Sequence, residues 1–289
     1  MMNRRALLGA IPLLGLAVRA APAVAQADGA APFAALEAEL KCRLGISVWD
    51  LESGRRWSHR AGERFPLCST FKLLAAAAVL ARVDAGREDL ARTVRFEASE
   101  VVTYSPVTKE RAGIGMSMAE ICAAAVTLSD NTAGNLMLDS LGGPSALTAF
   151  VRSLGDDTTR LDRRETELNE ATPGDPRDTT SPDAMVGSLR ALLASETLSR
   201  RSRDQLEAWL ADSRTGAAKL KAGLPADWRI GDKTGAGEFG TTNEVAVIWP
   251  PRRRPVLAAI YMTETVASLD RKNAAFASIG RWLAETISS

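Results

Sequence analysis

The chain has 289 residues, of which 46% are hydrophobic and 25% are charged. This composition is typical of an ordinary folded protein and excludes the disordered and collagen-like classes. The formal net charge is only +1, so there is no electrostatic basis for binding nucleic acid.

Residues 1–25 have the features of a secretory signal peptide. A pair of arginines precedes an apolar run from Ala6 to Val18, and an A-V-A sequence that ends at Ala25 offers a cleavage site. The run is too short for a membrane-spanning helix, which needs about 20 residues. We therefore expect an exported mature protein, periplasmic or secreted, with no membrane association. The twin-arginine and general export routes both fit the leader.

The remaining elements follow from periodicity and turn residues. A helix is predicted over 31–45 with its end at Gly45, followed by two strands around a Ser53-Gly54 turn. Residues 66–210 have mainly helical patterns, interrupted by the charged segment 156–182, which has almost no aliphatic residues. Three strand patterns follow Asp227, and a last amphipathic helix covers 271–287. A loop as long as 156–182 is usually functional or disordered.

Strands at both ends of the chain and helices between them predict an α/β fold of the α+β sandwich type. The antiparallel sheet would be built from both chain ends and flanked by helices, next to an all-α lobe. The expected division is an α/β domain of residues 26–61 and 212–289 and an all-α domain of residues 62–211, which includes the loop 160–178. A functional site would then lie in the cleft between them.

One histidine and three cysteines limit the chemistry that is available. His59 alone cannot form a multi-histidine zinc site, and no Cys-x-x-Cys pair replaces it, so we expect no metal or other cofactor. Spacing does not show whether any of Cys42, Cys68 and Cys122 pair. We interpret Cys68 as a buried structural thiol rather than a nucleophile, because no histidine lies near it in the sequence.

Ser69 and Lys72 stand three residues apart at the start of an alanine-rich helical stretch, so they share a helix face. A serine hydroxyl becomes a good nucleophile when a base takes its proton, and a lysine can act as that base if burial lowers its pKa. Free N–H groups at the helix start can face a developing oxyanion. Alone, however, this spacing more often means a capping serine and an exposed lysine.

Two further triplets strengthen the functional interpretation. The sequence S-D-N at 129–131 supplies a hydroxyl for proton transfer and an amide for holding a substrate carbonyl. The sequence K-T-G at 233–235 lies on a predicted strand, where an ammonium and a hydroxyl suit a substrate carboxylate. The glycine lets the strand edge approach the substrate and offers the N–H of Ala236.

The ordered set S-x-x-K, S-D-N and K-T-G resembles the class A serine β-lactamases of the penicillin-binding protein superfamily, over about residues 30–285. The segment R-R-E-T-E-L-N at 163–169 is similar to the omega loop of that family. The resemblance implies a secreted, monomeric hydrolase that opens the amide of penicillins and cephalosporins through an acyl-enzyme on Ser69 and confers β-lactam resistance. Its only expected partner is the small-molecule β-lactam. The alternatives are a DD-peptidase or transpeptidase and a β-lactam binder that does not hydrolyse.

The resemblance also implies roles for individual residues. The implied catalytic residues are Ser69, Lys72, Ser129, Glu165, Asn169 and Ala236. The implied substrate-binding residues are Tyr104, Asn131, Lys233, Thr234, Gly235, Gly237 and Thr242. An ion pair between Arg163 and Asp178 would close the loop.

The chain departs from the family pattern at several positions. Thr166 stands where many members have proline, so the sequence leaves open whether the peptide bond before it is cis. Thr242 replaces an arginine that helps to bind the substrate carboxylate in some members, and the charge could come from one of three other cations: Lys219, Arg271 or Lys272. Many members have a disulfide at the positions of Ala76 and Cys122, and the alanine rules that disulfide out here. Some carbapenem-hydrolysing members have another disulfide at the positions of Cys68 and Gly237, and the glycine argues against that one.

Overall fold

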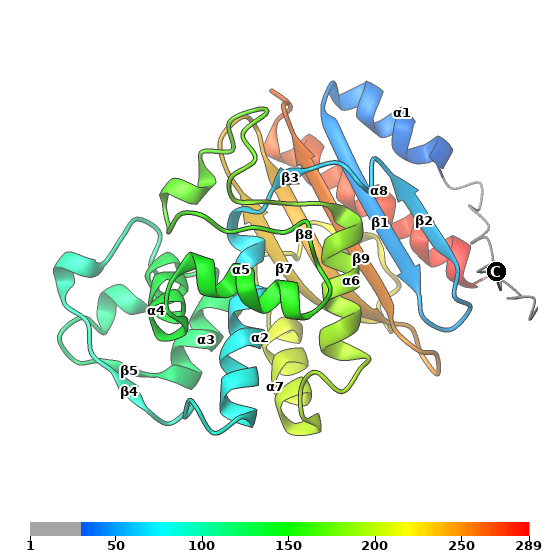
Figure 1. The fold of residues 1–289 in the computed structure, drawn as a ribbon. Helices are drawn as coiled ribbons and strands as arrows, with labels where there is room; N and C mark the ends of the chain where they lie inside the picture. The colour runs from blue at the N-terminus through cyan, green and yellow to red at the C-terminus, as the bar shows by residue number, and fades with distance from the viewer. Residues whose placement is uncertain (1–29, 289) are drawn as a thin grey trace, which may run out of the picture.

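The computed structural model describes residues 30–288, so the predicted signal peptide lies outside the described residues. A five-stranded antiparallel sheet with the strand order β2-β1-β9-β8-β7 forms the centre of the fold (Figure 1). Its strands are β1 (Arg43–Asp50), β2 (Arg56–His59), β7 (Arg229–Ala236), β8 (Thr242–Trp249) and β9 (Val256–Thr263). Because β1 pairs with β9 along its whole length, the predicted sheet from both chain ends is confirmed.

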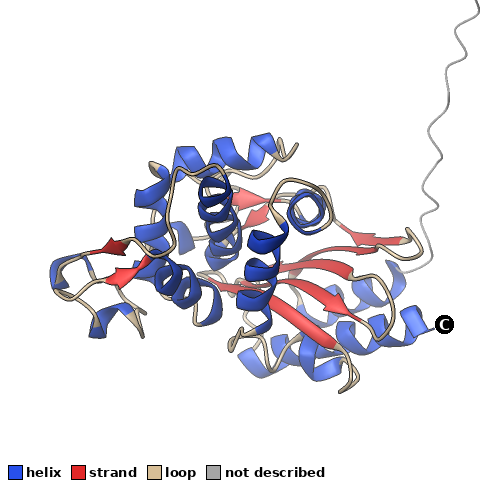
Figure 2. Ribbon diagram, turned by 90° about the horizontal axis from the view of Figure 1, so that it is seen from below, coloured by secondary structure: helices blue, strands red, loops and turns tan. Residues whose placement is uncertain are grey.

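Helices cover both faces of this sheet, which confirms the predicted α/β class (Figure 2). The helices are α1 (Ala30–Leu40), α2 (Phe71–Asp84), α3 (Met118–Thr127), α4 (Asn131–Leu141), α5 (Pro144–Ser153), α6 (Pro182–Leu193), α7 (Arg200–Ala211) and α8 (Leu269–Ser288). The short strand pairs are β3 (Phe65–Pro66) with β6 (Thr179–Thr180) and β4 (Thr93–Val94) with β5 (Met116–Ser117). The 3₁₀ turns are η1 (Cys68–Thr70), η2 (Ala98–Glu100), η3 (Thr108–Glu110), η4 (Glu167–Asn169) and η5 (Leu220–Gly223).

Two apolar cores follow from the alternation of side chains along the central strands. On β9, Ala259 and Tyr261 pack into the core that α2 shares with the other helices of the middle of the chain. Their neighbours Ala258 and Ile260 pack into a second core beneath α1 and α8. A strand buried on both faces is expected to be apolar at nearly every position, as β9 is.

Helix α2 runs between the sheet and the helices α3, α4 and α5 (Figure 1). Every residue from Phe71 to Leu80 is buried. Alanine is the best helix former, and the small side chains of Ala75–Ala78 let neighbouring elements approach closely. The helix therefore holds its N-terminal turn rigidly between the sheet and the helical part of the chain.

The predicted end of the first helix is wrong. Helix α1 ends at Leu40 and strand β1 begins at Arg43, so Gly45 lies inside a strand. Lys41 has a φ of 45°, which ends the helix. The ring of Phe65 lies so close to Gly45 that an added Cβ would meet it at 2.3 Å. Gly45 is therefore required by packing between β1 and Phe65, and not by a helix stop.

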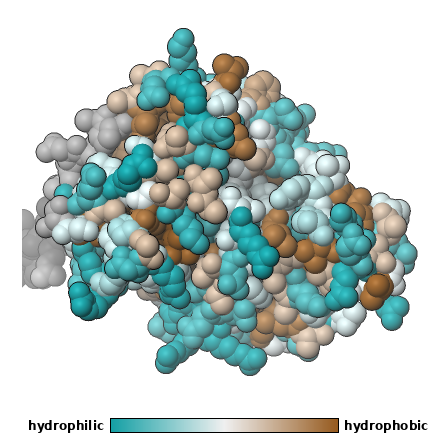
Figure 3. Space-filling model, turned by 180° about the vertical axis from the view of Figure 1, so that it is seen from behind, coloured by the Kyte–Doolittle hydropathy of each residue, from teal (hydrophilic) through white to brown (hydrophobic). Residues whose placement is uncertain are grey.

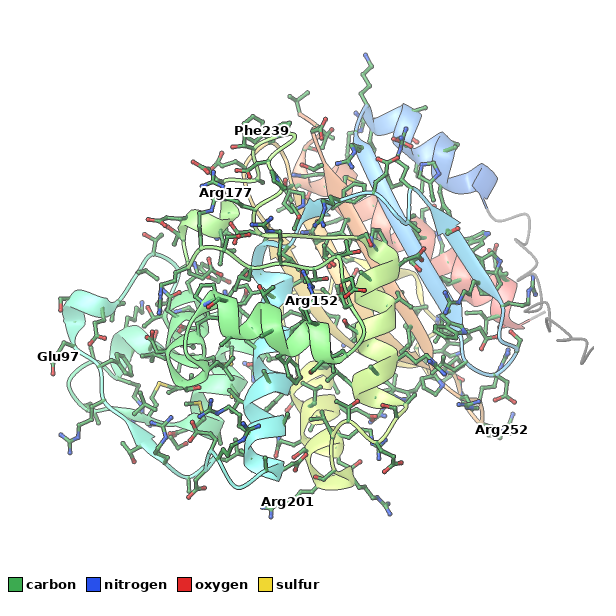
Figure 4. The ribbon with its side chains drawn as sticks, in the orientation of Figure 1. Glu97, Arg152, Arg177, Arg201, Phe239 and Arg252 are labelled. Atoms are coloured by element: carbon green, nitrogen blue, oxygen red, sulfur yellow. The ribbon has the colours of Figure 1, made fainter. Side chains whose placement is uncertain are left out.

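The segment 156–182 is a folded loop rather than a disordered one. Arg152 on α5 donates to the carbonyl oxygens of Asp156 at 2.5 Å and Thr159 at 2.6 Å, which anchors the start of the loop (Figure 4). Deeper in the loop, Asp178 accepts hydrogen bonds from the Nε of Arg163 at 2.6 Å and from the backbone N–H of Arg163 at 2.9 Å. The peptide bond between Glu165 and Thr166, which the sequence left open, is cis.

The ion pair of Arg163 and Asp178 gives a prediction on stability. The Asp178 side chain is only 1% exposed, and breaking a buried pair by removing one partner usually costs about 3–5 kcal/mol. We expect Asp178→Ala to lower the free energy of unfolding by about 3 kcal/mol, as measured by urea unfolding. Arg177→Ala in the same loop is the control, because Arg177 is exposed (Figure 4) and its ion pairs are screened by solvent, so its loss should lower the free energy of unfolding much less. Equal losses in the two variants would contradict this assignment.

The exposed face opposite the view of Figure 1 mixes hydrophilic and hydrophobic side chains (Figure 3). The arginine triplet 252–254 lies in the turn between β8 and β9, and Arg252 marks that turn in Figure 4. No helix within residues 30–288 is long and apolar enough to span a membrane.

Candidate active site

A cleft of about 490 Å³ brings the three sequence motifs together. Its lining combines Ser69 from the start of α2, residues of the loop before α4, and the end of β7. A larger hollow of about 600 Å³ lies around Trp49 and Arg190, but its lining includes no lysine that could activate a serine. The predicted residues in the cleft lining are Ser69, Tyr104, Ser129, Asn131, Asn169, Thr234, Gly235, Ala236 and Thr242.

Ser69 lies in η1, one turn before the buried body of α2. The Nζ of Lys72 donates to its hydroxyl oxygen at 2.9 Å, and the hydroxyl donates to Oε1 of Glu165 at 3.2 Å. Cys68, directly before Ser69, has a φ of 43°, which few residues other than glycine adopt. Such backbone conformations persist where the surrounding structure holds them, and they are common at functional sites. The nucleophile candidate thus contacts two candidate bases.

Lys72 is completely buried and its charge is surrounded by acceptors. Its Nζ lies 2.8 Å from Oε1 of Glu165 and donates to Oδ1 of Asn131 at 2.6 Å and to the carbonyl oxygen of Ser129 at 2.9 Å. Burial lowers the pKa of Lys72, and the Glu165 carboxylate partly opposes that effect. A lysine with a lowered pKa is more readily found in the neutral form that accepts a proton.

Glu165 is held at both its backbone and its side chain. Asn135 on α4 donates from Nδ2 to the carbonyl oxygen of Glu165 at 3.0 Å and accepts from its N–H at 2.9 Å. Asn169 donates to Oε2 of Glu165 at 2.5 Å. The Oδ1 atom of Asn169 is buried and has no hydrogen-bond partner among the described residues. These contacts fix the carboxylate beside Ser69 and leave one amide oxygen available to a ligand.

Ser129 lies across the cleft from Ser69, in a loop position with a φ of 60°. Its hydroxyl accepts a hydrogen bond from the Nζ of Lys233 at 2.9 Å. Lys233 is fully buried on β7, and burial lowers its pKa well below the usual value, helped by the nearby Lys72 ammonium. The S-D-N and K-T-G motifs are therefore joined by a direct contact of their first residues.

Glycine is needed where β7 passes the start of α2. A Cβ on Gly237 would lie 2.8 Å from the Sγ of Cys68 and 2.7 Å from the carbonyl oxygen of Asn169. A Cβ on Gly235 would lie 3.1 Å from the carbonyl oxygen of Leu67. Glu238 donates its N–H to the carbonyl oxygen of Asn169 at 2.9 Å, so the strand end also holds the loop.

One of the three candidate cations lies in the cleft. The Nζ of Lys219 donates to the hydroxyl of Thr242 at 2.6 Å, and both residues line the cavity. Lys272 instead donates to the carbonyl oxygen of Gly240 at 3.1 Å, and Arg271 lies 3.4 Å from the carboxylate of Glu39. Of these three cations, only Lys219 is among the residues that line the cleft.

The three cysteines are all free. Cys68 and Cys122 are fully buried, and burial raises the pKa of both thiols. A buried thiol with a raised pKa is a poor nucleophile, which favours the structural interpretation of Cys68. Within residues 30–288 no group of three or more His, Cys, Asp or Glu side chains could hold a metal ion.

Two residues that shape the site had no predicted role: Asp130, the middle residue of S-D-N, and Asn135, which lies in none of the motifs. Asp130 caps α4 through Ala133 and also accepts from the N–H groups of Val107 and Thr108 at 2.9 and 3.0 Å, so it holds the loop that carries Tyr104. Asn135 holds Glu165, as described above. Asn135 lies four residues after Asn131 on α4, so the two side chains share a helix face. This spacing is the signal in the sequence that could have identified Asn135.

Comparisons with known proteins agree with this geometry. The model of a family described as "Beta-lactamase enzyme family" matches residues 30–287. Beta-lactamase AER-1 of Aeromonas hydrophila is 48% identical over 87% of this chain and 83% of its own length. Beta-lactamase AST-1 of Nocardia asteroides is 48% identical over 88% of this chain and 82% of its own length.

A solved ancestral class A β-lactamase (GNCA) superposes with a TM-score of 0.87 and is 57% identical, covering 88% of this chain and 97% of that chain. Identity of 48% or more over at least 82% of each relative's length extends the likeness from the fold to the family. The chain therefore belongs to the beta-lactamase enzyme family, as a class A serine β-lactamase.

Proposed function

We propose that this enzyme hydrolyses the β-lactam amide through an acyl-enzyme on Ser69 and so confers β-lactam resistance. The observation that carries the proposal is the triangle of Ser69, Lys72 and Glu165, in which the three reacting atoms lie 2.8 to 3.2 Å from one another. A nucleophile within hydrogen-bond distance of a base that is itself oriented by further groups is the usual arrangement of covalent catalysis.

In the proposed acylation step, the hydroxyl oxygen of Ser69 attacks the lactam carbonyl carbon and its proton passes to Lys72 or to Glu165. The backbone N–H groups of Ser69 and Ala236 stabilise the oxyanion. The ring C–N bond then breaks, and the lactam nitrogen takes a proton from the hydroxyl of Ser129. The proton that left Ser69 passes on to Ser129, so that Lys72 and Glu165 return to their starting protonation states. Lys233 donates to that hydroxyl, which orients it for the transfer.

In the proposed deacylation step, Glu165 takes a proton from a water molecule, whose oxygen attacks the ester carbonyl. The ester C–O bond breaks, and the proton returns to Ser69. Asn169 contributes to this step because its buried Oδ1 lacks a partner among the described residues and can accept from the water. Two bonds from Asn135 fix the backbone of Glu165, so little reorganisation is needed.

The substrate carboxylate would bind at the far end of the cleft. Thr234, Gly235 and Thr242 supply hydroxyl and backbone groups there, and Lys219 supplies the positive charge that the strand arginine gives in some family members. Tyr104 is exposed at the rim and would stack on the substrate, and Asn131 lines the cleft. Gly237, the other predicted binding residue, is not among the lining residues and follows Ala236 directly along the chain.

The alternatives are a DD-peptidase or transpeptidase and a β-lactam binder that stops at acylation. Both could share the three motifs, but neither needs a carboxylate and an amide aimed at the acyl group. The bond between Glu165 and Asn169 therefore favours hydrolysis.

We also propose that residues 26–61 and 212–289 form one domain and residues 62–211 another. In the same proposal, the mature protein is an exported monomer, and Arg163 and Asp178 close the loop.

The purified mature chain, incubated with a chromogenic cephalosporin and followed by absorbance and intact mass, tests this function. We expect many turnovers per molecule and no lasting mass adduct. A single stoichiometric burst with a lasting adduct would contradict hydrolysis. Cleavage of a D-Ala-D-Ala peptide by the same preparation would then separate a peptidase from a binder.

A further inference from the structure

We propose that the groove between α2 and α5 is a second binding site, which takes a carboxylate with a short apolar tail. The α2–α5 groove is a cavity of about 280 Å³, and its lining shares no residue with the catalytic cleft. This inference goes beyond the proposed function and does not depend on it, because binding in the groove requires no reaction.

One face of each helix forms the walls of the α2–α5 groove. Ala78 and Ala81 lie three residues apart on α2, and Ala146 and Phe150 lie four apart on α5, so each pair shares a helix face. Leu141, the last residue of α4, adds a third apolar side, and the three helices pack against one another (Figure 1). Because three of these five side chains are alanines, the helices leave a hollow with apolar walls that a hydrocarbon chain can contact.

Two arginines supply the only charged side chains in the lining of the groove. Arg82 is half-buried in the last turn of α2, and Arg87 is exposed just beyond the end of that helix. The Nε of Arg82 is buried and has no hydrogen-bond partner among the described residues. Within residues 30–288, no carboxylate forms an ion pair with either guanidinium. A guanidinium is always charged in proteins, so a bound carboxylate would supply the missing negative charge.

The acids nearest to these arginines in the sequence are engaged elsewhere. Both carboxylate oxygens of Glu88 accept from the guanidinium of Arg92 at 2.7 Å. Asp84 accepts from the hydroxyls of Ser199 and Ser202 at 2.7 Å and from the N–H of Ser199 at 2.8 Å. The positive charge of the groove is therefore left for a ligand to neutralise.

The walls and the charges together define the class of ligand. Apolar side chains suit a hydrocarbon tail, and two guanidinium groups without an acid in the lining suit a carboxylate. The larger hollow around Trp49 and Arg190 differs, because three aspartates line it beside its arginines. Ligand sites usually begin at about 300 Å³, so a cavity of about 280 Å³ fits a short chain. Octanoate is therefore a suitable probe.

The test is an NMR titration of the purified mature protein with octanoate, observed on alanine methyl groups. We expect saturable binding with a dissociation constant of about 1 mM or lower, which is within reach of a ligand of this size. Shorter carboxylates should bind about threefold more weakly for each CH₂ removed, because apolar contact is lost. 1-Octanol has the same tail without the charge and should bind at least about tenfold more weakly than octanoate.

The same spectra locate the bound octanoate. The methyl groups of Ala81 and Ala146 line the α2–α5 groove, whereas those of Ala218 and Ala236 line the catalytic cleft. Each signal is assigned by its loss on substitution with serine. The two groove signals should shift along one saturation curve, and the two cleft signals should stay in place.

Three variants and a control test the role of the charge. Arg82→Gln should raise the dissociation constant of octanoate at least about tenfold. Ala146→Glu places a carboxylate in the groove and should bind octanoate at least about tenfold more weakly than Ala146→Gln, which has the same size without the charge. Arg201→Gln removes an exposed arginine of α7 outside the groove (Figure 4) and should keep wild-type affinity. Circular dichroism should show every variant folded.

Four results would each overturn the proposal: no saturable binding, wild-type affinity in Arg82→Gln, equal binding of octanoate and 1-octanol, or methyl shifts confined to the cleft. Equal affinities of Ala146→Glu and Ala146→Gln would also contradict it, because the added charge would then have no effect. Absence of β-lactam turnover with octanoate binding intact would instead count against the proposed function alone.

Discussion

Glu165→Gln is expected to stop the reaction at the acyl-enzyme. The substitution keeps the size of the side chain and its bonds to Asn135 and Asn169, but an amide cannot take a proton from water. General-base catalysis is worth about 10²–10⁴ in rate, so the deacylation rate should fall by about 10³. Acylation should continue because Lys72 still contacts Ser69 at 2.9 Å. Stopped-flow absorbance should show one equivalent of cephalosporin consumed per enzyme, followed by almost no turnover.

The matched control lies two residues further along the same loop. Glu167 is an exposed carboxylate at the start of η4, and Glu167→Gln should keep wild-type turnover. If Glu165→Gln turns over as fast as the control, Glu165 has no place in the mechanism. If Glu165→Gln also fails to consume the first equivalent of cephalosporin, Glu165 is needed for acylation and not only for hydrolysis of the acyl-enzyme.

Lys72→Met is expected to have the opposite kinetic signature, a loss of acylation. Methionine fills much of the buried volume of the lysine, but it removes the amine that donates to Ser69, Asn131 and the carbonyl oxygen of Ser129. We expect kcat/KM to fall by about 10³, with no burst and no adduct. Rapid-quench mass spectrometry after milliseconds to seconds of mixing measures the acylation rate directly.

Lys221→Met serves as the control. It makes the same chemical change at an exposed lysine of η5, away from the reacting atoms. Circular dichroism and thermal unfolding should show both variants folded. A rapid burst in Lys72→Met would mean that Glu165, which also contacts the Ser69 hydroxyl at 3.2 Å, takes the serine proton by itself.

Periodicity and turn residues were sufficient to predict the fold class. Strand patterns at both chain ends and an apolar last strand predicted the antiparallel sheet, because these signals are local and repeat every two residues. The boundary at Gly45 was missed for a reason that is not local: Phe65, which lies 20 residues further along the chain, packs against that glycine. A glycine required by a distant ring has the same appearance in the sequence as a helix stop.

The candidate site shows the same difference between local signals, which the sequence carries, and contacts between distant residues, which it does not. Residues in short motifs could be named in advance because their order along the chain carries the signal. Lys219 could not be chosen over Arg271 or Lys272, since the choice depends on which cation the sheet and α8 bring beside Thr242.

The most direct test of the central claim is to locate the acyl group. Glu165→Gln is treated with a cephalosporin, denatured and digested, and the modified peptide is sequenced by mass spectrometry, with Ser69→Ala treated in parallel. The mechanism predicts a single acyl group on Ser69 in the first variant, and neither adduct nor turnover in the second. An adduct on any other residue, or cephalosporin hydrolysis by Ser69→Ala, would contradict it.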